Sequence, residues 1–331
     1  MRGPTAEEIR SFGATNGGID MPVFEGDYSF IDAGLSDRSY AELPEVLVHR
    51  EYKDIAESFK ASLDRLMSFF ELPLQLIYWS ARISVIKHIA RYRCGLSPED
   101  DSRDHELQVS EAVKRVWDEI VRPSQGTRTV SFSTGVLATM LGDRGSTGID
   151  PAREGVEAVL AAMVMASYAA FETLAADLWV EAVNRHNSLA TNWMEKNSEK
   201  QIPGAVLASY EFNVSSYMGT ILHSTKKVSF ESLNDIRNLY RQAFKGAMDD
   251  AFEPIDDLVK AEKTRHLFAH RRGLVDRKFK DQMKDYPEYT SAVIGERLRL
   301  TGPVTGSYVA ACAKCGVALL KAIDNWSVAQ T

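Results

Sequence analysis

Cysteine is scarce in this chain, with three residues among 331. So few thiols cannot build a disulfide framework, and the composition predicts a reducing, cytoplasmic location. Two of them, Cys312 and Cys315, form a Cys-x-x-Cys pair within an apolar stretch, and no second pair accompanies them. We therefore expect two small core residues, with a redox or zinc role as the alternative.

Targeting and nucleotide-binding signals are also missing. The first residues have no apolar segment typical of a signal peptide, and charges interrupt the apolar stretches before they reach the expected length of a membrane span. Residues 1–140 contain no Walker loop, no nucleotidyltransferase signature and no Gly-x-Ser-x-Gly. The sequence thus predicts no membrane partner and assigns no chemistry to this part of the chain.

Positive charge is in deficit overall, since the formal net charge is −7. This balance argues against broad non-specific binding of nucleic acid. The window from Lys260 to Lys280 is the exception, because eight lysines and arginines against two acids leave it at +6. A polyanion could dock on this window, although a solvated surface is the simpler interpretation.

Helical periodicity dominates the apolar positions and predicts a mainly α protein. We expect an extended arm over 1–40, a smaller helical N-terminal region over 41–145, and a helical bundle with a short C-terminal β element over 146–331. Glycines and a proline between 142 and 151 suggest the boundary. The expected helices are 51–70, ended by Pro73, then 74–93, 105–121, 150–184, 210–222, one that starts at Ser229 or Ser232 and reaches 244, 255–270 and 304–326, with strands at 127–134 and 296–301.

The segment 263–279 concentrates the residues best suited to chemistry. In a helix, His266 and His270 lie four apart on one face, and Arg265 lies about 100° from His266. A guanidinium binds phosphate, while imidazoles move protons near neutral pH. Gly273 fits the end of this helix.

This segment resembles the Arg-(four to six residues)-His signature of HEPN domains. The signature residues are Arg265 and His270, and the continuation His-x-x-Gly-x-Val-Asp-x-x-Phe also resembles bacterial HEPN-type proteins. The resemblance covers roughly residues 150–325. It implies a helical bundle and a metal-independent endoribonuclease without cofactor, acting in a toxin–antitoxin or antiphage defence context. It also implies a homodimer, because such nucleases pair two motifs across one cleft, and an inhibitor or antitoxin protein is a further expected partner.

Cleavage of RNA by its own 2′-hydroxyl needs a base, an acid and a cation at the phosphate. His270 is the expected base or acid, Arg265 the expected phosphate ligand, and His266 a supporting member of the catalytic group. Glu172, at the flank of the long helix 150–184, is either a carboxylate at the edge of the core or a supporting residue that holds Arg265 in position. The cations expected to bind RNA are Lys263, Arg271 and Arg272.

Two alternatives remain at this point. His266 and His270 have the spacing of zinc ligands, but zinc hydrolases of this pattern need a glutamate where this chain has Leu267. A non-catalytic HEPN-like module that binds RNA or a protein would explain the basic window equally well.

Overall fold

The computed structural model describes residues 40–95, 109–115, 149–199, 201–253 and 255–330. Over these residues the protein is mainly helical, as the periodicity predicts, and no strand longer than an isolated bridge occurs among them. Residues 109–115 are helical. The expected arm, the expected strand at 127–134 and the expected boundary near 145 lie outside the described residues. The helices are α2 (Leu43–Val46), α3 (Arg50–Arg93), α6 (Ile149–Arg185), α7 (Asn187–Glu195), α8 (Gly204–Ser209), α9 (Val214–Ser224), α10 (Leu233–Phe244), η3 (Asp249–Phe252), α11 (Ile255–Arg271), α12 (Arg277–Gln282), η4 (Pro287–Tyr289) and α13 (Gly302–Val328).

Contacts within the chain divide it into two compact units. The first consists of Met1–Ser29 and Ser68–Gly155, and the second of Phe30–Met67 and Val156–Thr331. The helices α3 and α6 each contribute residues to both units. All residues of the candidate site belong to the second unit, which is described below.

One expected helix end is wrong, because α3 runs from Arg50 to Arg93 without stopping at Pro73. A proline inside a helix removes one backbone hydrogen bond and strains one turn. The result is either a bent helix that continues or the end of the helix. The flanking sequence has helical periodicity on both sides. The two helices expected at 51–70 and 74–93 are therefore one element.

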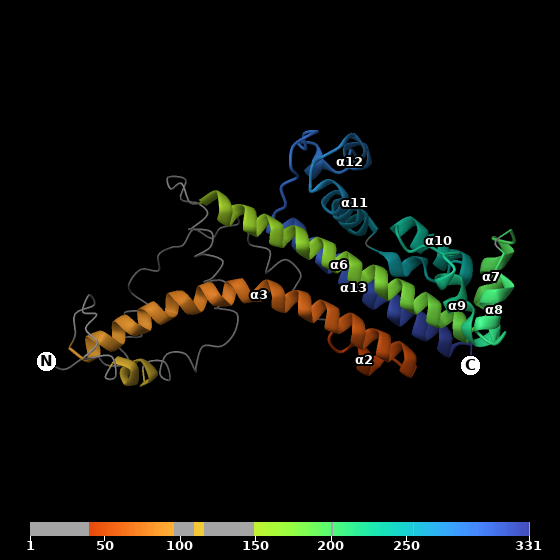
Figure 1. Ribbon diagram of the computed structural model, residues 1–331, viewed down its shortest axis with the longest axis horizontal. Helices are drawn as coiled ribbons and strands as arrows, with labels where there is room; N and C mark the ends of the chain where they lie inside the picture. The colour runs from red at the N-terminus through yellow and green to blue at the C-terminus, as the bar shows by residue number, and fades with distance from the viewer. Residues whose placement is uncertain (1–39, 96–108, 116–148, 200, 254, 331) are drawn as a thin grey trace. The chain divides into compact units, whose positions relative to one another are not determined.

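The core of the second unit is built around α6 and α13, which run side by side (Figure 1). At their contact, a Cβ atom on Gly316 of α13 would lie 2.8 Å from the side chain of Leu174 on α6 and 2.6 Å from the ring of Phe59 on α3. Such distances leave no room for a larger residue. Three helices thus meet closely at this glycine.

Both long core helices are apolar enough to cross a membrane by length and composition. They are Glu157–Arg185 and Gly302–Val328, and 50% and 72% of their most apolar windows are buried inside the structure. The expectation that charges break up every such stretch is therefore wrong. The core helix of a protein passes the same test, and half or more of each window is buried inside the structure.

Cys312 and Cys315 lie in this core, as expected from their apolar context. Neither is solvent-exposed, and the Cys315 thiol donates a hydrogen bond to the Ala251 carbonyl, with 3.2 Å between Sγ and O. Burial raises the pKa of the Cys312 thiol to about 12. A thiol with such a pKa stays protonated at neutral pH, which suits packing and not nucleophilic chemistry.

The expected C-terminal β element is reduced to one antiparallel bridge, between Leu274 and Arg297. Hydrogen bonds flank it from the Val275 amide to the Glu296 carbonyl (2.9 Å) and from the Leu298 amide to the Gly273 carbonyl (2.8 Å). The alternation in 296–301 does predict extended backbone. A ladder cannot grow there, because the partner segment has only three residues before α12 begins.

Candidate functional site

The helix α11 carries the motif and ends one residue after His270, at Arg271. Its end is set by two residues with left-handed backbone, Arg272 (φ 55°) and Gly273 (φ 78°). The Gly273 amide donates to the Leu267 carbonyl at 3.2 Å. A Cβ atom on Gly273 would lie 2.7 Å from the Phe268 ring. Glycine is therefore needed here both for its conformation and for its size.

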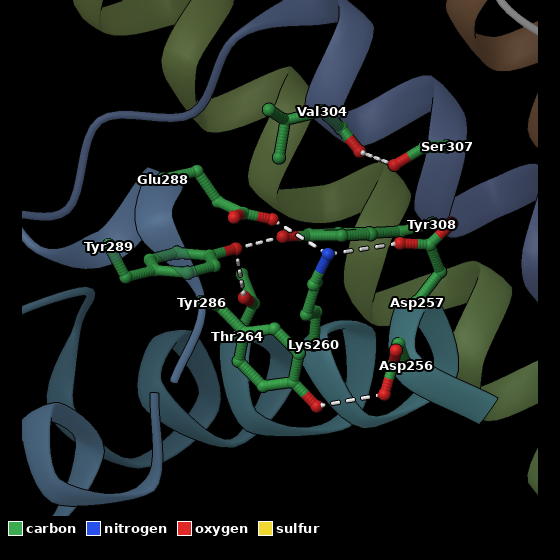
Figure 2. A network of polar contacts seen from close by, with 10 residues as sticks. All are labelled: Asp256, Asp257, Lys260, Thr264, Tyr286, Glu288, Tyr289, Val304, Ser307 and Tyr308. Carbon is green, nitrogen blue, oxygen red and sulfur yellow. Dashed lines mark hydrogen bonds and ion pairs between the residues drawn. The ribbon is translucent and has the colours of Figure 1, made fainter. Parts of the chain in front are cut away.

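The inner face of α11 packs on α13 and α10. Thr264 is fully buried on this face, and its hydroxyl is 3.4 Å from that of Tyr289. The Tyr289 hydroxyl is in turn hydrogen-bonded to that of Tyr308 on α13 (Figure 2). Glu262, also buried, accepts a hydrogen bond at 3.2 Å from the amide of Leu233, the first residue of α10. These contacts fix the rotation of α11 about its axis.

Ion pairs at the start of α11 attach it to the segment around η4. Figure 2 shows Lys260 between Glu288, at 2.7 Å, and Asp257, at 3.4 Å. The same ammonium lies 4.8 Å from the centre of the Tyr286 ring, and the Tyr286 hydroxyl donates to Asp256 at 3.3 Å. Lys260 lies in the basic window, but its charge is already neutralised by these carboxylates.

Arg265 and Glu172 are joined by an ion pair between α11 and α6, which is the second of the two roles considered for Glu172. The distance from Nη2 to Oε2 is 3.0 Å, and the two side chains are 26% and 15% exposed. The guanidinium carbon also lies 5.9 Å from the centre of the buried Tyr168 ring. The guanidinium thus faces α6 and is held there by a carboxylate and an aromatic ring.

This ion pair is electrostatically unusual. Burial raises the pKa of Glu172 to about 7; the charge of Arg265 opposes the shift, and Glu262 and Glu231 add to it. The second oxygen of Glu172, Oε1, is buried without a hydrogen-bond partner among the described residues, as is the Tyr168 hydroxyl. Near neutral pH the carboxyl is therefore close to the midpoint of its titration.

The two motif histidines are exposed neighbours on α11. The ring centres of His266 and His270 are 4.4 Å apart, with 50° between the ring planes. Desolvation lowers the pKa of His266, and the charges of His270, Lys278, Arg265 and Lys263 lower it further, in that order. His266 is therefore mainly neutral at pH 7 and can accept a proton.

The cations expected to bind RNA differ in their partners. Lys263 contacts Glu262 at 2.7 Å, and Arg271 contacts Asp276 at 3.4 Å. Arg272 is exposed at the helix end. Sequence reasoning missed Lys278, an exposed residue of α12 whose charge acts on His266. The sequence pointed to Lys278 only through its place in the basic window. Its position relative to His266 depends on the direction that the chain takes after Gly273.

Arg265 and His270 do not converge on one point within the chain. They are five positions apart, with four residues between them, which corresponds to about 140° around an α-helix. The guanidinium is engaged by α6, whereas His270 is exposed. Among the described residues, no group of three or more His, Cys, Asp or Glu could hold a metal ion. Compared with known proteins, the chain matches no family model, and neither a curated protein nor a solved structure shows significant similarity to it.

Proposed function

We propose that this protein is a metal-independent endoribonuclease of HEPN type. The observation that carries the proposal is the pair of exposed imidazoles on α11, His266 and His270, with 4.4 Å between their ring centres. Imidazoles provide both proton transfers that transesterification of RNA requires. Arg265, at the first position of the motif, is the expected ligand of the phosphate.

The reaction proposed is attack of the ribose 2′-oxygen on the adjacent phosphorus. The bond between phosphorus and the 5′-oxygen breaks, which leaves a 2′,3′-cyclic phosphate and a 5′-hydroxyl. DNA lacks the attacking group, so the substrate is RNA. The basic window from Lys260 to Lys280, at +6 in a chain of net charge −7, is the surface proposed to bind RNA.

The proposed assembly is a cytoplasmic homodimer with the two α11 helices close to its two-fold axis. It rests on the resemblance, since each chain has one motif and the family pairs two. The same resemblance is the basis for proposing a role in a toxin–antitoxin or antiphage system, with an inhibitor or antitoxin as protein partner.

A second candidate function is a non-catalytic module that binds RNA or a protein. The ion pair between Arg265 and Glu172 favours it, because a guanidinium held at 3.0 Å by a carboxylate that is only 15% exposed also fits a purely structural role. Such a module would use Arg272 and its basic neighbours for binding and would need no proton transfer.

The deciding experiment is cleavage of single-stranded RNA in EDTA by the wild type and by His270→Ala. Loss of a general acid or base lowers the rate by about 10²- to 10⁴-fold. His223→Ala is the matched control, because His223 is an exposed histidine on α9. Melting temperatures are measured for each variant, and light scattering gives the oligomeric state.

Unchanged cleavage by a folded His270→Ala protein would overturn the nuclease proposal. RNA binding without cleavage by the wild type would favour the non-catalytic module. Arg265→Ala is expected to reduce cleavage comparably, and Arg265→Lys to restore it only in part, because an ammonium cannot bind two phosphate oxygens as the planar guanidinium does.

A further inference from the structure

The antiparallel pairing that follows α11 brings a distant, positively charged segment to the motif helix. Its bridge joins Leu274 to Arg297. The Leu298 amide donates to the Gly273 carbonyl at 2.8 Å. Because Gly273 is the second residue after the end of α11, the segment that contains Arg297 lies against the end of the motif helix.

Exposure alternates along this segment. Leu298 is partly buried and Leu300 is 5% exposed, whereas Arg297 and Arg299 are both exposed. Neighbouring side chains of a paired segment point to opposite sides. The two arginines are therefore on its outer side, and neither belongs to the basic window from Lys260 to Lys280.

Leu274 adds an apolar group to the same outer side. It is directly opposite Arg297, and the hydrogen bonds that flank this bridge come from the neighbouring residues. Facing side chains approach most closely in a pair of this kind. Since Leu274 is 47% exposed, the outer side of the pairing combines an apolar side chain with guanidinium groups.

These two arginines differ from several cations of the motif helix in their partners. Arg265, Lys263 and Arg271 each contact a carboxylate, at 3.0, 2.7 and 3.4 Å. Within the part of the chain that the structure describes, no carboxylate forms an ion pair with Arg297 or Arg299. A paired cation must give up its partner to bind an anion, whereas these two arginines have no such cost.

The candidate chemistry lies beside this surface. His270 is in the last turn of α11, two positions before the exposed Arg272. Arg297 and Arg299 extend the positive charge beyond the helix end. A guanidinium binds phosphate oxygens with its planar fork, and its plane stacks on unpaired bases. The ligand that offers both groups is a single strand of RNA.

We propose that Arg297 and Arg299, together with Leu274, form an arginine surface that binds single-stranded RNA next to the cleaved bond. This inference rests on the proposed function and deepens it by adding a binding region outside the motif. The arginine surface adds no member to the acid–base group. It is therefore compatible with a site that two chains build from their two motifs.

Binding is measured with a labelled single-stranded RNA whose 2′-hydroxyls are methylated, because this RNA cannot be cleaved. Arg297→Gln and Arg299→Gln are each expected to weaken binding about three- to tenfold at low salt. Each is also expected to reduce the salt dependence of binding by about one counterion. Arg50→Gln is the matched control, because Arg50 is an exposed arginine at the start of α3 and its loss changes the net charge equally.

Cleavage tests the same surface through the length of the substrate. A dinucleotide contains only the scissile phosphodiester, whereas a longer strand also reaches the arginines. The ratio of kcat/KM for the long strand to kcat/KM for the dinucleotide is expected to fall about tenfold in the double variant Arg297→Gln/Arg299→Gln. The control Arg50→Gln is expected to keep the wild-type ratio, and melting temperatures show that each variant is folded.

The outcomes separate this inference from the proposed function. Binding and a length ratio like those of Arg50→Gln in all the folded variants would overturn the arginine surface, while cleavage by the wild type would still support the ribonuclease. A wild type that binds the methylated RNA through these arginines but cleaves no RNA would overturn the ribonuclease and support the surface as part of an RNA-binding module. A wild type that neither binds nor cleaves RNA would overturn both.

Discussion

The pH dependence of folding offers a direct test of the ion pair between Glu172 and Arg265. The perturbation is Glu172→Gln, which keeps the shape of the side chain and removes its titration. Because burial raises the pKa of Glu172 from 4.5 to about 7, the folded protein binds a proton that the unfolded chain has already lost between these pH values. The free energy of unfolding must therefore fall as the pH rises through this window.

The size of the effect follows from the shift. At about 1.4 kcal/mol per pH unit, a change from 4.5 to about 7 corresponds to about 3 kcal/mol. The side chain is 15% exposed, so this figure is an upper value. At pH 5 the folded carboxyl is neutral, and glutamine should reproduce it closely. At pH 8 the wild type contains a buried carboxylate and the variant does not.

The assay is urea denaturation at pH 5 and pH 8 for the wild type, Glu172→Gln and the exposed control Glu199→Gln. The wild type and the control are expected to lose stability between the two pH values, and Glu172→Gln is expected to lose about 2–3 kcal/mol less. Arg265 stays charged from pH 5 to pH 8. The absence of its carboxylate partner in Glu172→Gln therefore cannot produce a pH-dependent difference of this kind. The same pH dependence in all three proteins would refute the reasoning.

Two further predictions concern stability. Gly273→Ala places a methyl group against Phe268 at a left-handed position, so a loss of about 1–3 kcal/mol is expected in urea denaturation; an unchanged midpoint would contradict this. Burial raises the pKa of Asp324, but hydrogen bonds from the Val48 and His49 amides, at 2.7 and 3.0 Å, outweigh it and hold the pKa below its usual range. Asp324→Asn should cost about 1–3 kcal/mol at pH 7 and less at pH 3, because below the ordinary pKa of 3.8 the unfolded chain takes up a proton and the folded carboxylate contributes less stability; an equal cost at both pH values would exclude the charge as the cause.

The sequence predicted the helices best where apolar residues recur without interruption, as in α6, α11 and α13. It failed at Pro73, because local propensity cannot show whether a proline bends a helix or ends it. It failed again at 296–301, where the structure has only an isolated bridge at Arg297 in place of the expected strand. The length of a β-ladder depends on both partner segments. Here the partner of 296–301 is the short segment between Gly273 and the start of α12 at Arg277.

The candidate site was predictable to a similar extent. His266 and His270 are close in sequence, so helical spacing alone brings them together. Glu172 is 93 positions from Arg265, and the pairing could be anticipated only because a lone carboxylate at the flank of an apolar stripe needs a partner. Lys278 could not be placed, since its distance from His266 depends on the direction in which the chain leaves α11.

The second unit is formed by two separate segments of the chain, which limits where the protein can be truncated. Its core includes Tyr52, Phe59 and Leu63, which precede the motif helix by about 200 residues and are almost fully buried. A fragment that began at residue 146 would keep every residue of the candidate site but would lack these side chains, and Gly316 and Leu174 would face water where Phe59 now packs. Cutting the gene at the boundary expected near residue 145 would thus separate the site from part of its own interior. Ribosomes must also synthesise the 88 residues from 68 to 155 before the two parts of this core can meet.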